Sequence, residues 1–371
     1  MTGQGSQVRI LYHPPKIPLS IAPMAVLHNP VNRELLRKQL MEEAFQRVTL
    51  SFYRYVRIAD PSAFRDQLYQ EWHALGCFGR IYLAEEGINA QMSVPEHVMD
   101  AFRHNLEQHD ALRGVPLKIA VEDDGKSFYK LTLKIRPKIV ADGIDDPAFD
   151  SSNVGRHLNA AEFNAAMEEP GTLVVDMRNH YESKIGHFEG AILPDVDTFR
   201  EELEQVPRLL AGQEDRKILL YCTGGIRCEK ASAWLKYQGF NDVNQLHGGI
   251  IDYARQIQEH GLPNKFKGRN FVFDERMGER ISDDVLGKCD LCGEPCDHYT
   301  NCARKACHQL FIQCPACSER LQGCCGPTCQ DLLAKASTDE ASPDETTIPV
   351  KLNNPMPGKY TKGRIHKKSI N

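Results

Sequence analysis

The stretch LLYCTGGIRCEKASAWL, residues 219–235, constrains the fold more than any other part of the chain. An apolar run ends at Cys222, a Gly-Gly turn follows, and a helical pattern starts at about Glu229. Short apolar strands alternate with helical segments throughout residues 150–262, which predicts a parallel sheet flanked by helices. Ligands of such a sheet bind at the carboxyl ends of its strands. We therefore predict an α/β domain with Cys222 at the edge of the sheet where ligands bind.

The loop after Cys222 has the composition of an anion-binding turn. Glycines permit positive φ angles, and the N–H groups of the loop and of the helix N-terminus favour negative charge. Together with the fixed charge of Arg227, they should stabilise the Cys222 thiolate as a nucleophile. We expect Cys222 and Arg227 to be catalytic, and Cys228 is a candidate second thiol, with a half-buried helix cysteine as the alternative. The other residues of the predicted active-site loop are Thr223, Gly224, Gly225 and Ile226.

The spacing separates this loop from two other interpretations. Cysteine-dependent phosphatases place one more residue between the cysteine and the arginine, and Cys228 occupies that arginine's position here. The smaller loop fits one additional sulfur atom better than a phosphate group. The plain alternative is a pair of inert cysteines in a strand–helix turn, but Gly-Gly followed by arginine is a poor way to build a core.

The rest of the chain divides into regions of different composition. Residues 1–23 lack the long apolar region of a signal peptide and are predicted to be a flexible extension. Residues 24–141 have the order β-α-β-β-α-β, which predicts an α+β ferredoxin-like domain. The polar segment 334–371 is predicted to be a disordered tail. No apolar run reaches the ~18 residues of a membrane span. The net charge of −5 does not by itself indicate a nucleic-acid partner.

Thirteen cysteines without a secretory signal indicate a reducing, cytoplasmic compartment, where clustered cysteines bind metal or do chemistry. Ten of them lie in residues 285–333. Two Cys-x2-Cys pairs have nearly the spacing of a zinc ribbon, so we predict a small module with one or two structural zinc sites. A disulfide framework and a redox or iron–sulfur role are the alternatives. The predicted ligands are Cys289, Cys292, Cys314 and Cys317, and the further candidates are Cys296, Cys302, Cys307, Cys324, Cys325 and Cys329.

The loop at Cys222 resembles the active-site loop of rhodanese domains. Two more motifs agree in order with that pattern, namely VVDMRNHYESKIGHFEGAI at 174–192 and LHGGI at 246–250. The resemblance implies a rhodanese-like sheet in which Cys222 would carry a persulfide. Asp176 and Arg178, in the first of these motifs, are expected to be scaffold rather than chemistry.

Over residues 24–330 the chain resembles the bacterial tRNA uridine-34 5-hydroxylase family. Motifs that carry this resemblance include SFYRYVRIADP, LAEEGINAQMSVP, NFVFDERMGERISD and CHQLFIQCPAC. It implies oxygen-dependent conversion of the wobble uridine to 5-hydroxyuridine, with Cys222 required, an unknown electron donor and no organic cofactor. Either the thiolate adds to uridine C6, or a persulfide or sulfenic acid of Cys222 carries the oxygen chemistry. A persulfide sulfurtransferase and an RNA- or protein-binding module with an inactive rhodanese domain are the alternative functions.

The tRNA anticodon loop is the partner that the resemblance implies, and its bases would have to be splayed out to be reached. Tyr53 and Tyr55 share one face of a predicted strand and could stack on bases. Lys134, Arg136 and Lys138 alternate with apolar residues, which would place three cations on one face of another strand. From the residues alone a solvated sheet face is the favoured alternative, and the resemblance favours RNA binding.

Overall fold

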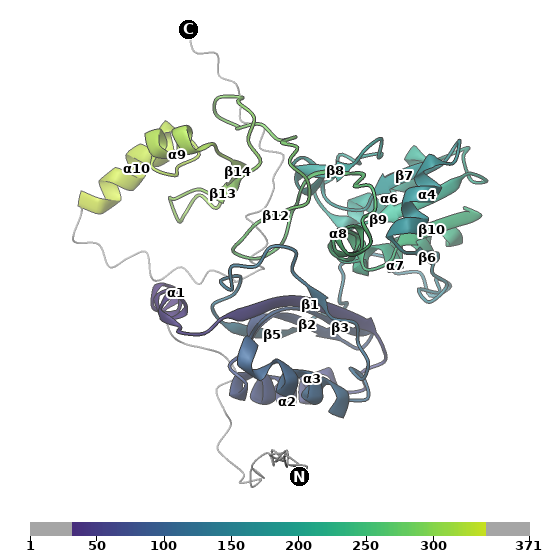
Figure 1. Cartoon of the computed structure of the whole chain (residues 1–371), viewed down its shortest axis with the longest axis horizontal. Helices are drawn as coiled ribbons and strands as arrows, with labels where there is room; N and C mark the ends of the chain where they lie inside the picture. The colour runs from purple at the N-terminus through teal and green to yellow at the C-terminus, as the bar shows by residue number, and fades with distance from the viewer. Residues whose placement is uncertain (1–31, 339–371) are drawn as a thin grey trace, which may run out of the picture.

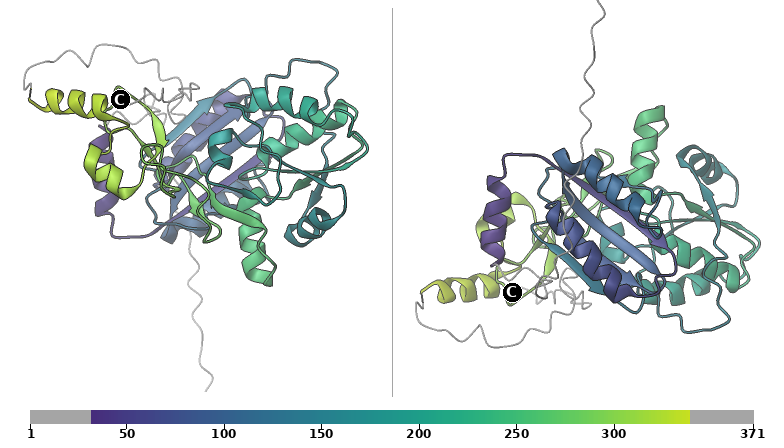
Figure 2. Two further views of the ribbon diagram at one scale, coloured as in Figure 1. Left: turned by 90° about the horizontal axis from the view of Figure 1, so that it is seen from above. Right: turned by 90° about the horizontal axis from the view of Figure 1, so that it is seen from below.

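The structure of the protein, a computed structural model, describes residues 32–338. The expected extension 1–23 and most of the expected tail 334–371 lie outside the described residues. An α+β domain, an α/β domain and a cysteine-rich module follow one another along the chain (Figure 1). The second domain and the helices of the cysteine-rich module lie at opposite ends of the molecule (Figure 2). No helix among residues 32–338 is long and apolar enough to cross a membrane.

The first domain has the predicted ferredoxin-like topology. Its strands pair in the order β4-β1-β3-β2-β5, and β5 runs parallel to β2 as an additional edge strand. Helix α2 begins as the sequence predicts, because the Asp60 carboxylate accepts two backbone N–H groups and Pro61 is the first helical residue. The elements are α1 (Arg33–Glu42), β1 (Arg47–Tyr55), α2 (Pro61–Ala74), β2 (Phe78–Ala84), β3 (Gly87–Pro95), α3 (Met99–Gln108), β4 (Lys118–Ile119) and β5 (Leu131–Ile135).

The sheet of the first domain has one apolar and one polar face. Leu50 and Phe52 of β1 point into the core beneath α2 and α3, which cover only this side of the sheet (Figure 1). Side chains alternate along a strand, so Ser51 and Tyr53 lie on the opposite face. Lys118 is paired with Ser51 in the register and shares that face. The polar face is turned toward the second domain.

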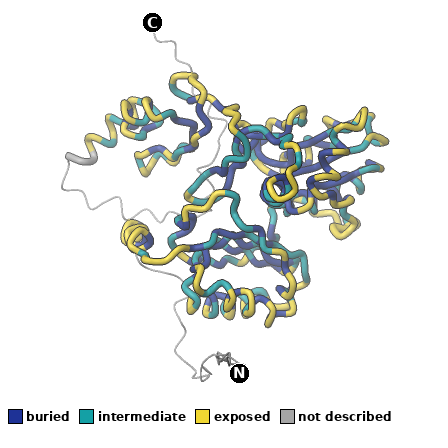
Figure 3. The backbone as a smooth tube through the Cα atoms, in the orientation of Figure 1, coloured by how far each residue is buried: buried dark blue, intermediate teal, exposed yellow. Residues whose placement is uncertain are grey.

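The second domain is a parallel sheet flanked by helices, as predicted. Its strand order is β6-β10-β9-β7, and every pair in it is parallel. The innermost strands are buried on both faces (Figure 3). The elements are β6 (Arg156–Leu158), α4 (Ala160–Glu168), β7 (Leu173–Asp176), α5 (His180–Ser183), β8 (Gly186–Phe188), α6 (Phe199–Leu209), β9 (Lys217–Tyr221), α7 (Ile226–Tyr237), β10 (Asp242–Leu246) and α8 (Gly249–His260).

The alternation of side chains along β9 determines toward which core Cys222, the residue after the strand, points. Ile218, Leu220 and Cys222 pack in one core with α6 and α7. Leu219 and Tyr221 pack in the other core with α4 and α8. Because the strand is covered on both sides, its sequence is continuously apolar rather than alternating.

The C-terminal module is attached to the second domain by β11, which pairs with β8 in antiparallel fashion. Two cores of this module are built largely from cysteines and the residues around them. Helix α10 continues beyond residue 333, the expected end of the module. The elements are β11 (Phe266–Asn270), β12 (Glu279–Arg280), β13 (Tyr299–Asn301), β14 (Leu310–Ile312), α9 (Pro315–Leu321) and α10 (Pro327–Thr338).

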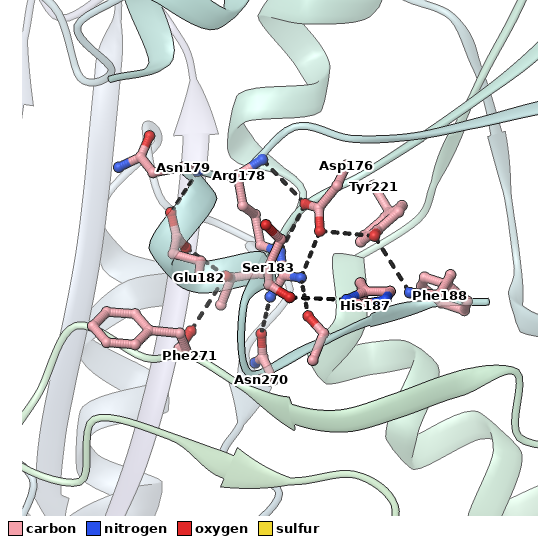
Figure 4. Close-up of polar contacts among 12 residues, drawn as sticks. Asp176, Arg178, Asn179, Glu182, Ser183, His187, Phe188, Tyr221, Asn270 and Phe271 are labelled. Carbon is pink, nitrogen blue, oxygen red and sulfur yellow. Dashed lines mark hydrogen bonds and ion pairs between the residues drawn. The ribbon is translucent and has the colours of Figure 1, made fainter. Parts of the chain in front are cut away.

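A buried ion pair connects the strands behind the loop at 223–226 that follows Cys222, called the reactive loop below (Figure 4). The Arg178 guanidinium donates to both carboxylate oxygens of Asp176, at 2.8 and 2.6 Å, and both side chains are fully buried. Arg178 also donates to the Gly186 carbonyl of β8 and to Asn270 of β11. The hydroxyl of Tyr221, at the end of β9, donates to Asp176 at 2.7 Å. These contacts indicate that the ion pair of Asp176 and Arg178 has a structural role.

Replacing Arg178 by methionine should destabilise the protein by about 3–5 kcal/mol, because the Asp176 charge would remain buried without its partner. Urea unfolding of the full chain, followed by circular dichroism, measures this loss. Arg208→Met is the matched control, since Arg208 is exposed on α6 and its loss should cost less than about 0.5 kcal/mol. Equal stability of the two variants would contradict a structural role for the ion pair.

Candidate active site and cysteine clusters

The loop after β9 wraps around the sulfur of Cys222. Gly225 adopts a φ of +94°, and the helix α7 begins directly after it at Ile226, earlier than the expected Glu229. The Gly225 N–H donates to Cys222 Sγ at 3.2 Å. The backbone N–H groups of Arg227 and Cys228 also donate to this sulfur. The structure therefore brings the expected loop residues together around one sulfur atom.

Cys222 and Cys228 have opposite protonation preferences. Burial raises the pKa of the Cys222 thiol, but the Cys228 thiol, the charge of Arg227 and the loop N–H groups lower it more, to about 6. Burial and the neighbouring Cys222 raise the pKa of Cys228 well above its ordinary value. At neutral pH, Cys222 is thus the thiolate and Cys228 is a thiol that donates to it.

Arg227 is a fixed positive charge rather than a mobile one. Its guanidinium donates to both oxygens of Glu182, at 2.6 and 2.8 Å, and one nitrogen lies 3.4 Å from the Thr223 hydroxyl oxygen. Glu182 is fully buried in α5 and also accepts the Asn179 N–H (Figure 4). Bidentate pairing of this kind fixes the plane of the guanidinium. Glu182 lies in the motif at 174–192, but no local pattern indicates its pairing with Arg227, which is 45 residues away along the chain.

The Gly-Gly-Ile motif at 248–250 supports the loop from the other side. Ile250 N–H donates to the Cys222 carbonyl at 3.0 Å, and Ile251 N–H donates to the Thr223 carbonyl at 3.2 Å. A Cβ on Gly249 would stand 2.5 Å from the Cys222 carbonyl oxygen, and its φ is +69°. Only glycine fits there, so this motif positions the backbone of the reactive loop.

The two tyrosines predicted to stack on bases contact the second domain. The Tyr53 hydroxyl donates to Glu229 at 2.9 Å, and the Tyr55 hydroxyl donates to the Ile226 carbonyl at 3.3 Å. Both residues therefore lie beside the N-terminus of α7, and neither has the open sheet face that the sequence suggested. The difference arises because two domains pack together here, which no local pattern indicates.

The three predicted cations do not form one strand face. Lys134 and Arg136 lie near Arg80 on the polar face, and burial, followed by the charges of these two arginines, lowers the pKa of Lys134. Strand β5 ends before Lys138, whose ammonium group donates to Asp142 at 2.6 Å. The expected alternation of three cations is therefore wrong at Lys138, because the chain has left the strand there.

Eight cysteines of the C-terminal module form two clusters, in each of which the four Sγ atoms lie within 4.8 Å of one another. The two Cys-x2-Cys pairs meet in the first cluster. All thirteen cysteines of the chain lie among the described residues and none is joined in a disulfide, so the structure forms no disulfide framework. Cys296 and Cys324 stay outside both clusters. Cluster 1 is Cys289, Cys292, Cys314 and Cys317, and cluster 2 is Cys302, Cys307, Cys325 and Cys329.

A parallel sheet with a cysteine at a strand end, followed by a glycine turn that opens a helix, defines a rhodanese-like domain. The family model of the rhodanese-like domain matches residues 159–256. The UPF0176 acylphosphatase like domain matches residues 47–139, and the rhodanase C-terminal family matches residues 267–330. The chain belongs to the tRNA uridine(34) hydroxylase family, as its similarity to curated relatives shows.

The curated relatives are similar to this chain over most of their length and of its own. The tRNA uridine(34) hydroxylase of Leptospira interrogans is 60% identical over 307 residues, which cover 83% of this chain and 84% of the relative. The tRNA uridine(34) hydroxylase of Escherichia coli K12 is 56% identical over 307 residues, which cover 82% and 88%. The crystal structure of the Alr3790 protein from Anabaena sp. is 22% identical, covers 30% of this chain and 91% of its own, and has a TM-score of 0.25.

Replacing Cys228 by alanine should raise the pKa of Cys222 from about 6, because the thiolate loses the thiol that donates to it. Alkylation by iodoacetamide, measured peptide by peptide by mass spectrometry, should reach half its maximal rate near pH 6 in the wild type and at higher pH in Cys228→Ala. Cys77 is the internal control, because burial raises its pKa to about 12 and the substitution does not touch it. An unchanged Cys222 profile would show that Cys228 does not support the thiolate.

Proposed function

We propose that this protein hydroxylates C5 of uridine 34, the wobble base of tRNA, with molecular oxygen as oxidant and Cys222 as the reactive residue. Membership of the tRNA uridine(34) hydroxylase family supports the substrate and the reaction. The observation that carries the role of Cys222 is its stabilised thiolate, enclosed by loop N–H groups and by Arg227. A nucleophile of this kind can act on an electron-poor ring without an organic cofactor.

The step that uses this thiolate is addition to C6 of the uracil ring. The S–C6 bond forms, and the electron pair of the C5–C6 double bond moves through C4 onto the O4 oxygen, so that C5 becomes electron-rich. C5 then reacts with dioxygen, one oxygen atom remains on C5, and the other leaves as water. Two electrons and two protons come from a reductant of the thiol class, which becomes a disulfide. Loss of the C5 proton and of the Cys222 thiolate from C6 restores the C5–C6 double bond.

The polar face of the first domain is the surface that we propose for the RNA backbone. Arg80, Lys134 and Arg136 gather there, and the Arg136 guanidinium lies 5.5 Å from the centre of the Tyr82 ring. Cations that touch phosphates position an RNA without reading its sequence. The residues that contact the reactive loop lie on β4 and β1, toward the other edge of the same sheet face. An anticodon loop laid across this face from β5 toward β4 would reach Cys222.

The two cysteine clusters are proposed to hold one structural zinc ion each. Cys292 and Cys314 have sulfur atoms 3.7 Å apart, and those of Cys307 and Cys325 are 3.6 Å apart. A tetrahedral site with zinc–sulfur bonds of about 2.3 Å has sulfur–sulfur edges of about 3.8 Å. Four thiolates without an open position suit a structural ion, and zinc would provide folding energy to a module with a small apolar core.

Purified full-length protein should contain two zinc ions per chain, as measured by inductively coupled plasma mass spectrometry. Cys292→Ala removes one thiolate of cluster 1, so we expect one tightly bound ion in that variant. Cys296→Ala is the matched control, since Cys296 lies in the same module but outside both clusters, and it should keep two ions. Iron in place of zinc, or a zinc content that Cys292→Ala leaves unchanged, would contradict the proposal.

Cells that lack this protein should lose 5-hydroxyuridine and its derivatives from their tRNA. Nucleoside mass spectrometry should find the modification restored by the wild type and absent with Cys222→Ala, because the nucleophile is missing. Cys77→Ala is the control for loss of a buried cysteine far from the loop, and it should restore the modification. Unchanged hydroxylation with loss of a thiolated nucleoside would instead indicate a persulfide sulfurtransferase.

A further inference from the structure

Lys118 belongs to the first domain, but its side chain reaches the reactive loop of the second. Its Cδ lies 3.9 Å from the place where a Cβ on Gly224 would stand. Its Nζ lies 4.5 Å from the centre of the Tyr53 ring, and the residue is only 6% exposed. The hydroxyl of Tyr53 lies 2.9 Å from the Cβ position of Gly225. A lysine and a tyrosine of the first domain thus lie directly over the Gly-Gly turn.

The Lys118 ammonium group forms no hydrogen bond or ion pair with the part of the chain that the structure describes. Burial lowers the pKa of Lys118, and the charges of Asp252, Cys222 and Glu229 oppose this effect. Glu229 is already engaged by Tyr53 and by other donors of its own domain. An ammonium group has three donors, and leaving them unsatisfied in a buried place is costly. The group is therefore suited to a ligand that brings an oxygen acceptor to the loop.

We propose that Lys118 is a catalytic residue that binds the O4 oxygen of the uracil ring and stabilises the negative charge that forms there when Cys222 adds to C6. This inference rests on the proposed function, because it assigns a partner to the charge created by that addition. The bond and electron changes are those of the addition step, in which O4 receives the electron pair of the C5–C6 double bond. Lys118 holds this oxyanion until the thiolate leaves.

The burial of Cys222 agrees with such an arrangement. Its side chain is fully buried, and Lys118 and Tyr53 lie over the neighbouring glycines, so a uracil ring has to enter between the turn and the polar sheet face. The four-carbon stem of a lysine is flexible, so the ammonium group can move aside and remain within reach of the ring. The active site is then complete only when both domains contribute to it.

The test is hydrogen exchange at C5 of uridine 34 without oxygen. Reversible addition of Cys222 makes C5 basic, so in heavy water a deuteron adds there and the original proton is lost when the thiolate leaves. Wild-type protein and unmodified tRNA, kept anaerobic in heavy water, should yield deuterated uridine 34 by mass spectrometry. This readout needs neither the oxidant nor the reductant.

Lys118→Met should slow the exchange about 100-fold, since removal of one donor to a developing oxyanion costs about that factor. Lys118→Arg keeps the charge and should restore a substantial part of the rate. Lys38→Met is the matched control, because Lys38 is exposed on α1 and its loss should leave the rate unchanged. Exchange by Lys118→Met at the wild-type rate would overturn the role of Lys118 and leave the addition step intact.

Two further outcomes separate this proposal from its alternatives. If the wild type hydroxylates tRNA but exchanges no hydrogen, both the addition and the role of Lys118 are wrong, while the hydroxylase function stands. If Lys118 only balances the charge of Asp252, the double variant Lys118→Met, Asp252→Asn should regain the exchange that Lys118→Met loses. Continued absence of exchange in the double variant, with wild-type thermal stability and normal Cys222 alkylation, supports a catalytic role.

Discussion

The buried negative charge of Cys222 makes the strictest physical demand on this structure. The sulfur lies inside the second domain, where a thiolate survives only if donors and positive charge surround it. The Gly225 N–H and the Cys228 thiol act from the loop itself, and Arg227 is held in place by Glu182. Each of these groups is useful only at one position, so the loop needs rigid support on every side.

That support comes from packing between the two domains as well as from the rhodanese-like sheet. Helix α7 carries Arg227 and Cys228 in its first turn, and Lys230 follows in the next turn. Its ammonium group donates to Glu86 of the first domain at 2.6 Å and to Asp142 of the linker at 2.8 Å. Charged groups bonded across this interface fix its geometry, although they add little net stability. The first domain is therefore held in register with the reactive loop.

The cysteine-rich module serves the site indirectly. Its strand β11 pairs with β8, and Asn270 at the end of β11 contacts Arg178 behind the loop. The module also contacts the first domain, since Arg80 donates to the Phe273 carbonyl. A short segment with few apolar residues cannot hold such a position by packing alone, which is consistent with metal ions in its two thiol clusters.

Much of the fold was predictable because the relevant signals are local. Alternation of strands and helices, the Asp60 cap and the continuous apolar run of β9 each depend on neighbours a few residues apart. The position of Cys222 at a strand end follows from the same pattern. The Cys-x2-Cys spacing indicated metal ligands, but only the folded chain shows which cysteines share a cluster. Helix α7 begins three residues before the expected Glu229, because a glycine with positive φ can open a helix that the apolar pattern shows only further on.

Residue type and short spacing are enough to predict the candidate cysteine Cys222, its loop and the class of sheet that carries them. Which distant groups face that cysteine can be read only from the folded chain. Glu182, Lys118 and Tyr53 come from other strands and helices, and they meet at the loop because sheet register and domain packing bring them there. The same packing took Tyr53 and Tyr55 off the open surface. Contacts between residues far apart in the chain leave no periodic signal, which is why these partners emerge only in three dimensions.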